Sequence, residues 1–497
     1  MMATTTGTTR ATTTGSGWGA AETATREPIF TQGSLWPTWG ACRKGKRSSR
    51  DAQRYDQHLL DHLVATKQAL PAGKWCPRRS RWFVTSRPTA REVHCAEFGD
   101  RVVHHWLVPR LDALFVPVFI HDSHSNRAGH RLHYAVDRLQ HDLRSATANG
   151  TRKAWVLQID IGNFVNCIDR PPLYRLIEHR VHKDWRIRSV SPVEAQCLLC
   201  LTRRVFAQVP AQQFRYIGAP GREGRVPGHN RLSNVPRGLD LAINNLPSQL
   251  FANIYLNEMD QFIKHRLGVQ GYVRYVDNFV LVGPHRERLL RCRTGIEKFI
   301  DNELGLRLRD AGRLAEAADG LDFLGYMIRP GYRLVRRRVI HSLQEKRRIF
   351  RKRLWRAQGS GLALNAPWRE AQALRTCLDS YLGHFRHART WRLTRRVLAR
   401  NHWLPVLCRL LGGPRLQPLW QPPSVVGLKS QWFWFRKHFP EALVLLQVGR
   451  EFEIFTNRPA RKRPPACCRS PCRAHIFVAE QGYLPEGLKR CVLRLGW

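Results

Sequence analysis

The sequence predicts an α+β protein, and three observations carry that prediction. Between residues 155 and 326, short apolar strands alternate with amphipathic helices. The segments on either side, 43–144 and 341–410, have mainly helical patterns and are rich in arginine. The 497-residue chain is 43% hydrophobic, which supplies enough apolar surface for a core of ordinary size. We therefore expect a mixed central domain between two basic, largely helical regions.

The charge of the chain predicts a polyanionic partner. There are 82 Lys and Arg residues against 38 Asp and Glu, a formal net charge of +44, which favours nucleic acid binding over binding of a small neutral substrate. Every long apolar stretch is interrupted by a charged residue or a histidine, so we expect no membrane partner. The N-terminus lacks the apolar core of a signal peptide, which predicts a cytoplasmic location and mostly free thiols for the 13 cysteines.

The N-terminal part divides into two segments. Residues 1–40 are rich in Thr, Gly and Ala and are expected to form a disordered leader. Residues 41–150 form a cationic lobe, with a helix near 55–70, a strand at 82–84 and a helix over 101–114.

The chemistry is expected in the central domain, 151–335. A buried-type strand, 155–160, ends in Asp160, and a β-rich segment, 272–282, folds at a tight turn that Asp277 and Asn278 tolerate well. If strand and hairpin share one sheet, Asp160 and Asp277 converge. A converging carboxylate pair suits two divalent cations and in-line nucleotidyl transfer.

The segment between the two acidic residues supports this interpretation. A helix over 250–266 places Phe251, Ile254, Tyr255, Met259, Phe262 and Ile263 on one face, so it can pack under the sheet. Strand, long helix and hairpin follow one another in the order of a polymerase palm.

Four motifs resemble, in order and spacing, those of bacterial reverse transcriptases: LQIDIGNFVNCID, INNLPSQLFANIYLNEMDQF, GYVRYVDNFVLVG and GLDFLGYMI. Ser248-Gln249, with Ile243 before them, is similar to the subgroup from diversity-generating retroelements, as are FGDRVVHHWL and FIHDSHSNRAGHRLHYAVDRL. The resemblance covers about 35–410. It implies a right-hand polymerase with fingers (41–150), palm (151–335) and helical thumb (336–411). It also implies RNA-templated DNA synthesis with two Mg²⁺ ions, or Mn²⁺, and error-prone copying of template adenines.

The resemblance also assigns roles to residues. Asp160, Asp277 and the backbone carbonyl of Ile161 would be metal ligands, and Asn278 would complete the catalytic motif. Arg91 and Arg127 would meet the incoming triphosphate, for which a guanidinium is well suited. Ile243, Asn244, Ser248 and Gln249 would lie near the template, and Leu324 and Gly325 would support the primer. Expected partners are template RNA, cDNA or primer, dNTPs and an accessory basic retroelement protein.

Three residues depart from the family pattern. Asn278 replaces a second Asp, which removes one negative charge from the cation site. Asn244 replaces a Gly, a change that Asn tolerates better than other residues do. Val165 stands where the family carries a bulky aromatic side chain against the sugar, so we expect weaker discrimination against ribonucleotides unless Phe164 takes over that role.

The C-terminus is expected to hold a linker, 412–427, and a small α/β domain, 428–497. QWFWF and LVLLQVGREFEIF are similar to the first domain of the mismatch-recognition protein MutS, but Glu451 replaces the wedge Phe and only Glu453 is kept. This tail could bind a duplex or hybrid, or be purely structural. The cluster of Cys467, Cys468, Cys472 and His475 lacks the usual zinc-ligand spacing, so we do not expect zinc there.

Two other functions remain open. The chain could be a catalytically impaired RNA or RNA–DNA binding protein that retains the palm as a scaffold, which Asn278 favours. It could also be a group II intron or defence-type reverse transcriptase, which Ser248-Gln249 and Ile243 disfavour.

Overall fold

The computed structural model describes residues 32–47, 49–85, 90–187, 189–209, 212–218, 245–358, 361–364, 368–399, 408–411, 415–418, 444–448, 451–454 and 477–478, and scattered positions from 220 to 241. The chain divides into two compact units, with the boundary in the sequence between Tyr332 and Arg333. The predicted border between palm and thumb, 335/336, lies three residues further along the chain.

The N-terminal part of the chain forms four helices, α1 (Gln32–Arg43), α2 (Arg50–Gln57), α3 (Leu59–Ala69) and α4 (Phe98–Phe115). Both α1 and α2 contact α4, and α3 contacts α1 and α2. The prediction of a disordered leader is wrong for residues 32–40. Leu35, Thr38 and Cys42 recur at helical spacing and are buried, so α1 gains a packed apolar face that its composition alone does not reveal. Residues 1–31 lie outside the described residues.

A small sheet follows. It contains β1 (Ser80–Thr85), β2 (Arg91–Cys95) and β4 (Phe214–Tyr216) in the order β2-β1-β4. Strand β1 covers the predicted strand at 82–84. β2 pairs antiparallel with β1, opposing Arg91 to Thr85 at its first position.

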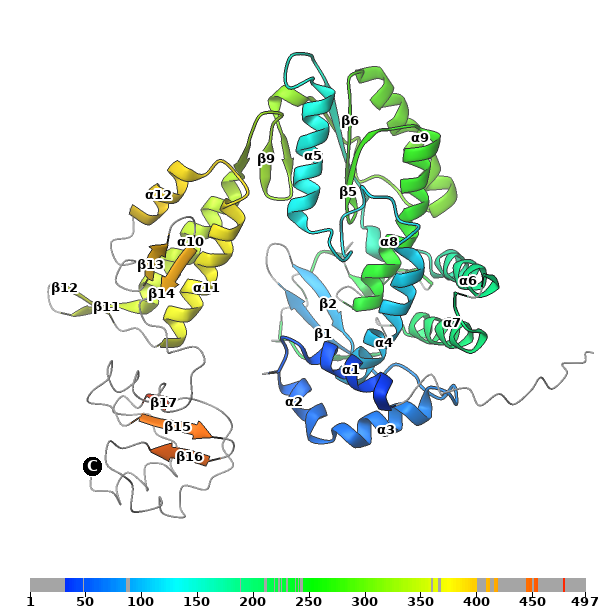
Figure 1. Cartoon of the computed structure of the whole chain (residues 1–497), viewed down its shortest axis with the longest axis vertical. Helices are drawn as coiled ribbons and strands as arrows, with labels where there is room; N and C mark the ends of the chain where they lie inside the picture. The colour runs from blue at the N-terminus through cyan, green and yellow to red at the C-terminus, as the bar shows by residue number, and fades with distance from the viewer. Residues whose placement is uncertain are drawn as a thin grey trace, which may run out of the picture. The chain divides into compact units, whose positions relative to one another are not determined.

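The central sheet has four antiparallel strands in the order β5-β6-β3-β7. These are β3 (Trp155–Asp160), β5 (Gly271–Tyr275), β6 (Asn278–Gly283) and β7 (Arg313–Glu316). Figure 1 shows α5 (Leu132–Ala146) and α9 (Arg286–Leu304) on either side of β5 and β6. Helix α5 contacts both strands, and α9 contacts β6 and β3. Helices on both faces explain why the strands are almost wholly apolar.

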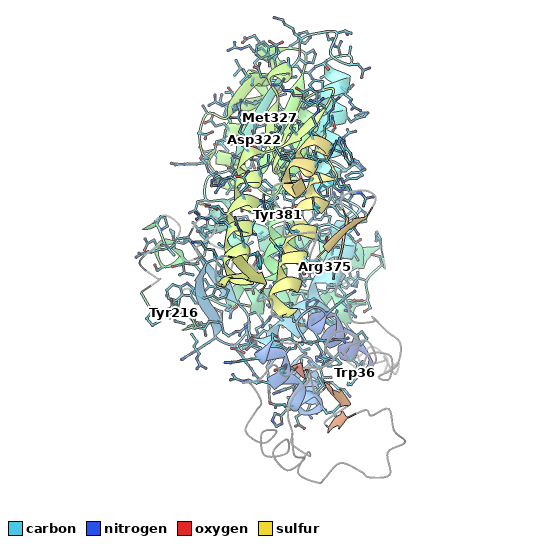
Figure 2. All side chains as sticks on the ribbon, turned by 90° about the vertical axis from the view of Figure 1, so that its left-hand side faces the viewer. Trp36, Tyr216, Asp322, Met327, Arg375 and Tyr381 are labelled. Carbon is cyan, nitrogen blue, oxygen red and sulfur yellow. The ribbon has the colours of Figure 1, made fainter. Side chains whose placement is uncertain are left out.

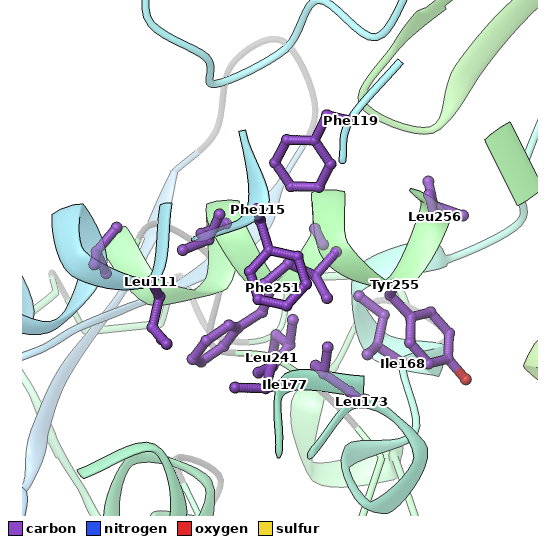
Figure 3. Close-up of a cluster of buried hydrophobic side chains, with 14 of the residues drawn as sticks. Leu111, Phe115, Phe119, Ile168, Leu173, Ile177, Leu241, Phe251, Tyr255 and Leu256 are labelled. Atoms are coloured by element: carbon purple, nitrogen blue, oxygen red, sulfur yellow. The ribbon is translucent and has the colours of Figure 1, made fainter. Parts of the chain in front are cut away.

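Helix α8 (Leu246–Gln261) forms the centre of the core. It contacts α4, α9 and α6 (Arg170–Arg186), and α7 (Pro192–Ala207) packs on α4 and α6. Figure 3 shows Phe251 and Tyr255 of α8 among apolar side chains of its neighbours. The predicted one-sided helix is therefore corrected, because α8 is buried on every side from Leu250 to Asn257, and its polar Asn253 and Asp260 are also buried. A π-helical turn, Phe262–Arg266, follows directly.

Two short strands complete the first unit. β8 (Leu321–Phe323) and β9 (Tyr326–Ile328) form an antiparallel hairpin in which Asp322 opposes Met327 (Figure 2). His133 Nε2 and Tyr326 Oη lie 2.9 Å apart and link the hairpin to α5.

The second unit begins with β10 (Arg333–Val335), and its helices are α10 (Arg337–Leu354), α11 (Trp368–Phe385) and α12 (Trp391–Ala399). Helices α10 and α11 pack together, and Tyr381 Oη lies 2.9 Å from Ser342 Oγ (Figure 2). Its later strands pair antiparallel. Strand β11 (Trp355–Gln358) pairs with β12 (Gly361–Leu364), and β13 (Cys408–Leu411) pairs with β14 (Arg415–Pro418). Strand β15 (Val444–Val448) pairs with both β16 (Glu451–Ile454) and β17 (Phe477–Val478). Strand β14 lies inside the range predicted as a linker.

Two chemical expectations can be compared with the described residues. Eight cysteines among them are free thiols: Cys42, Cys76, Cys95, Cys167, Cys197, Cys200, Cys292 and Cys377. The cluster 467–475 lies outside the described residues. Among the described helices, none combines the length and apolar character that a membrane span needs.

Candidate active site

The ends of two neighbouring strands bring Asp160 and Asp277 together. β3 pairs with β6 so that Asp160 opposes Asn278, the residue after Asp277. The Ile161 backbone N–H donates to the carbonyl of Asp277 over 3.3 Å, which draws the two chain segments together beyond the ladder. Burial and the negative charge of Asp277 raise the pKa of Asp160 to about 6. Burial raises the pKa of Asp277 as well. The two carboxylates therefore form an acidic pair that is costly to keep charged.

The turn that carries Asp277 is strained. Tyr275 opposes Asn278, so Val276 and Asp277 form the two-residue turn, one position earlier than predicted. Val276 has φ 60°, a conformation that is rare for a β-branched residue and costs about 1–3 kcal/mol. Such strain persists only when the surroundings fix the backbone.

Arg274 supplies much of that support. Its side chain is 1% exposed, and its guanidinium makes a bidentate ion pair with Asp260, at 2.8 Å from Nε to Oδ1 and 2.6 Å from Nη2 to Oδ2. Nη1 donates to the carbonyl of Val276 over 3.0 Å. One buried arginine thus connects the end of α8 to the strained turn.

The segment before α5 braces the same strand. The backbone of Asp122–His124 lies alongside Arg274: Arg274 N–H donates to the Asp122 carbonyl over 2.9 Å, and His124 N–H donates to the Arg274 carbonyl over 3.0 Å. Arg274 Nη2 also donates to Ser123 Oγ over 2.8 Å. The Asp122 carboxylate accepts from Lys264 Nζ at 2.7 Å, so this loop is fixed by buried polar contacts at several points.

The acidic pair has the donor chemistry for a hard divalent cation. Both groups offer carboxylate oxygens, which Mg²⁺ and Mn²⁺ prefer. Asp160 Oδ1 is buried and has no hydrogen-bond partner among the described residues, and an unpaired buried oxygen of this kind is stabilised by a cation. In the described part of the chain, no three His, Cys, Asp or Glu side chains are grouped to hold a metal ion. The fit therefore rests on two carboxylates and main-chain oxygens, with Ile161 the predicted contributor.

The two predicted triphosphate ligands have different surroundings. Arg91 is exposed at the start of β2, and its charge acts on Asp277 to lower that group's pKa, against the effect of burial. Arg127 is half-buried, and its Nη1 donates to the carbonyls of Ile120 at 2.6 Å and Ser123 at 2.8 Å. These bonds give Arg127 a structural role in the loop, and its role in phosphate binding stays a prediction.

The residues predicted near the sugar and the template have different surroundings. Val165 is partly buried in a 3₁₀ turn, Phe164–Cys167, and Phe164 is 2% exposed within the core, which leaves Phe164 poorly placed to replace an aromatic sugar gate. Ser248 is partly buried in the first turn of α8, and Gln249 is exposed beside it. Ile243 and Asn244 lie outside the described residues.

Asn278 and the β8–β9 hairpin are joined by a glutamine. Gln158 Nε2 donates to Asn278 Oδ1 over 3.2 Å and to the Asp322 carbonyl over 3.3 Å. The hairpin turns at Leu324 and Gly325, with φ values of 48° and 88°. Two positive φ angles are typical of a type I′ turn, in which leucine is unfavourable.

Sequence reasoning missed four residues of this site: Gln158, Asp260, Arg274 and Arg309. Arg274 did carry a signal, because a charged residue inside an apolar strand must find a buried partner. Its partner lies on α8, so only the packing of helix against sheet could identify it.

No protein-family model matches the chain, and no curated protein matches it in sequence. Among solved structures, the chain is similar to the apo telomerase of Candida tropicalis truncated from its C-terminal domain, at 8% identity and TM-score 0.37 over 56% of this chain. It is also similar to the telomerase of Candida albicans in complex with a fragment of telomeric RNA, at 12% identity and TM-score 0.36 over 66% of this chain. The matched regions span 60% and 56% of those two chains. With TM-scores below 0.5, neither similarity supports a function for this chain.

Proposed function

We propose that this protein is an RNA-directed DNA polymerase of the diversity-generating retroelement type, which copies a template RNA into cDNA by nucleotidyl transfer. The observation that supports it best is the meeting of Asp160 and Asp277 at adjacent strand ends, with the positive charge of Arg91 nearby. An acidic pair next to an exposed arginine suits a substrate that brings both cations and phosphates.

In this proposal each residue has a defined task. Asp160, Asp277 and the carbonyl of Ile161 would hold two Mg²⁺ ions, which would activate the primer hydroxyl and neutralise the leaving pyrophosphate. Arg91 would hold the triphosphate through charge-assisted hydrogen bonds. Arg274 fixes the turn that presents Asp277, so the carboxylate is oriented before substrate arrives.

The charge of the chain supports the nucleic acid partners. A net charge of +44 provides strong attraction for template RNA and primer. Helix α10 exposes Arg337, Arg338, Arg348 and Arg351, and these arginines could follow a phosphate backbone. The error-prone copying of adenines, the accessory basic protein and a duplex-binding role for 428–497 belong to the same proposal.

A second candidate is a non-catalytic RNA or RNA–DNA binding protein. The observation in its favour is that Asn278 replaces an acidic residue and that its amide oxygen already accepts a hydrogen bond from Gln158. An amide so engaged is a weaker cation ligand than a free carboxylate.

Primer extension on an RNA template with Mg²⁺ or Mn²⁺ separates the two candidates. We expect the wild type to extend the primer, and Asp277→Asn to lose at least about 100-fold in rate, since changes in the outer shell of a metal site already cost 10–100-fold. Asp301→Asn is the matched control, because this acid is 61% exposed and contacts Arg307 instead.

If the wild type does not extend the primer, the Asn278→Asp variant tests whether the missing carboxylate is the reason. An inert wild type together with an active Asn278→Asp variant would show that the site is no longer used for catalysis. If neither polymerises while both bind RNA, the binding protein is the correct interpretation.

A further inference from the structure

Arg309 contacts the acidic pair from a loop that the proposed reaction does not use. The loop, 305–312, connects α9 to β7. Arg309 N–H donates to the Asp160 carbonyl over 2.9 Å, and Gly162 N–H donates to the Arg307 carbonyl over 3.0 Å, so the loop extends the ladder beside the end of β3. The Arg309 guanidinium then forms an ion pair with Asp160 Oδ2.

The charges around the pair explain why a cation is needed there. Asp277 and Asp310 both act on Asp160 with the same sign of charge. Arg274 is already paired with Asp260. Arg309 is the cation that bonds directly to Asp160, and it uses Oδ2 while Oδ1 remains buried without a partner among the described residues.

The Arg309 side chain is also exposed enough to move away from Asp160. It is 56% exposed, whereas that of Asp160 is 22% exposed. An exposed ion pair of a long side chain contributes little to stability, because water and side-chain entropy offset its Coulomb energy. A divalent cation has twice the charge and would bind both carboxylates at once.

We propose that Arg309 is a positioning residue that acts as an internal counter-ion: it occupies Asp160 in the cation-free protein and competes with the divalent cation for that carboxylate. The inference rests on the proposed cation site at Asp160 and Asp277. Cation binding displaces the guanidinium, so the loop senses whether the site is loaded. The cost of the displacement weakens the apparent affinity for the cation.

Direct Mn²⁺ titration of the full chain, followed by the electron paramagnetic resonance signal of the free ion, tests this. Binding at the site is the part that Asp160→Asn removes. We expect Arg309→Gln to bind Mn²⁺ there at least about threefold more tightly than the wild type, the scale of an exposed ion pair. Arg309→Lys, which keeps the charge, should return toward the wild-type affinity.

Arg307→Gln is the matched control, since it removes the same charge from the same loop and its side chain is 90% exposed. It should bind as the wild type does. Equal or weaker binding by Arg309→Gln would overturn the inference, because a purely structural arginine would weaken the site when lost. If neither protein shows binding that Asp160→Asn removes, the proposed cation site itself is wrong, and the inference with it.

Discussion

Replacing Asp260 by asparagine tests the support beneath the strained turn. The two carboxylate oxygens of Asp260 accept from Arg274 at 2.6–3.0 Å and from Tyr272 Oη at 2.7 Å, and the side chains of the ion pair are 0–1% exposed. Asparagine keeps the shape but removes the charge and turns one oxygen into a donor that faces the guanidinium. Arg274 would then carry an uncompensated buried charge.

The structure sets the size of the effect. Breaking a buried pair by removing one partner costs about 3–5 kcal/mol. For a domain of this size, where 1 kcal/mol corresponds to roughly 2–4 °C, the thermal midpoint should fall by about 6–20 °C. Since Arg274 also donates to the Val276 carbonyl, Mn²⁺ binding at Asp160 and Asp277 should weaken as well.

Urea and thermal denaturation, followed by tryptophan fluorescence, measure the stability change. Glu297→Gln is the matched control, since it breaks an ion pair between Arg293 and Glu297 whose side chains are 28% and 51% exposed, and it should cost at most about 1 kcal/mol. A loss below about 1 kcal/mol for Asp260→Asn would refute the reasoning, because it would mean that Arg274 is not held as a buried charge.

Four further predictions follow from single features. Burial lowers the pKa of His104 to about 3, so below pH 6.5 the unfolded chain binds a proton that the folded chain excludes, and the wild type loses stability as the pH falls. Between pH 7.5 and 5, the free energy of unfolding of His104→Gln should therefore fall by roughly 2 kcal/mol less than that of the wild type. An equal fall in both proteins would contradict this. Leu324→Asn gives the type I′ turn a preferred residue and should raise stability by about 1 kcal/mol; calorimetry showing a loss would exclude the strain. Val165→Phe should reduce rNTP relative to dNTP incorporation by about tenfold or more, and an unchanged ratio would remove Val165 from the sugar site. Arg348→Gln with Arg351→Gln should lower the salt dependence of RNA binding, with the log–log slope falling by up to about 1.5; an unchanged slope would place these arginines away from phosphates.

The local elements of the central domain could be predicted from the sequence. The apolar run 155–160 matches β3, and the β-rich segment 272–282 matches β5 and β6 to within one residue at each outer end, because period-2 patterns and runs of β-branched residues are local properties. The helix between them can be predicted from apolar residues at helical spacing, which is also a local property. Only the packing shows that α8 is buried on every side from Leu250 to Asn257. The sequence predicts the turn at Asp277 and Asn278, one residue later than in the structure, because Asp and Asn favour turns. In the structure Val276 takes the positive φ instead.

The elements of the central domain, the strong positive charge and the two carboxylates at strand ends can be predicted from local patterns and composition. The register in which Asp160 opposes Asn278, and the ion pairs of Arg274 with Asp260 and of Arg309 with Asp160, become visible in the folded chain. A propensity acts over a few neighbouring residues, whereas an ion pair between residues 149 positions apart depends on how separate elements are buried together.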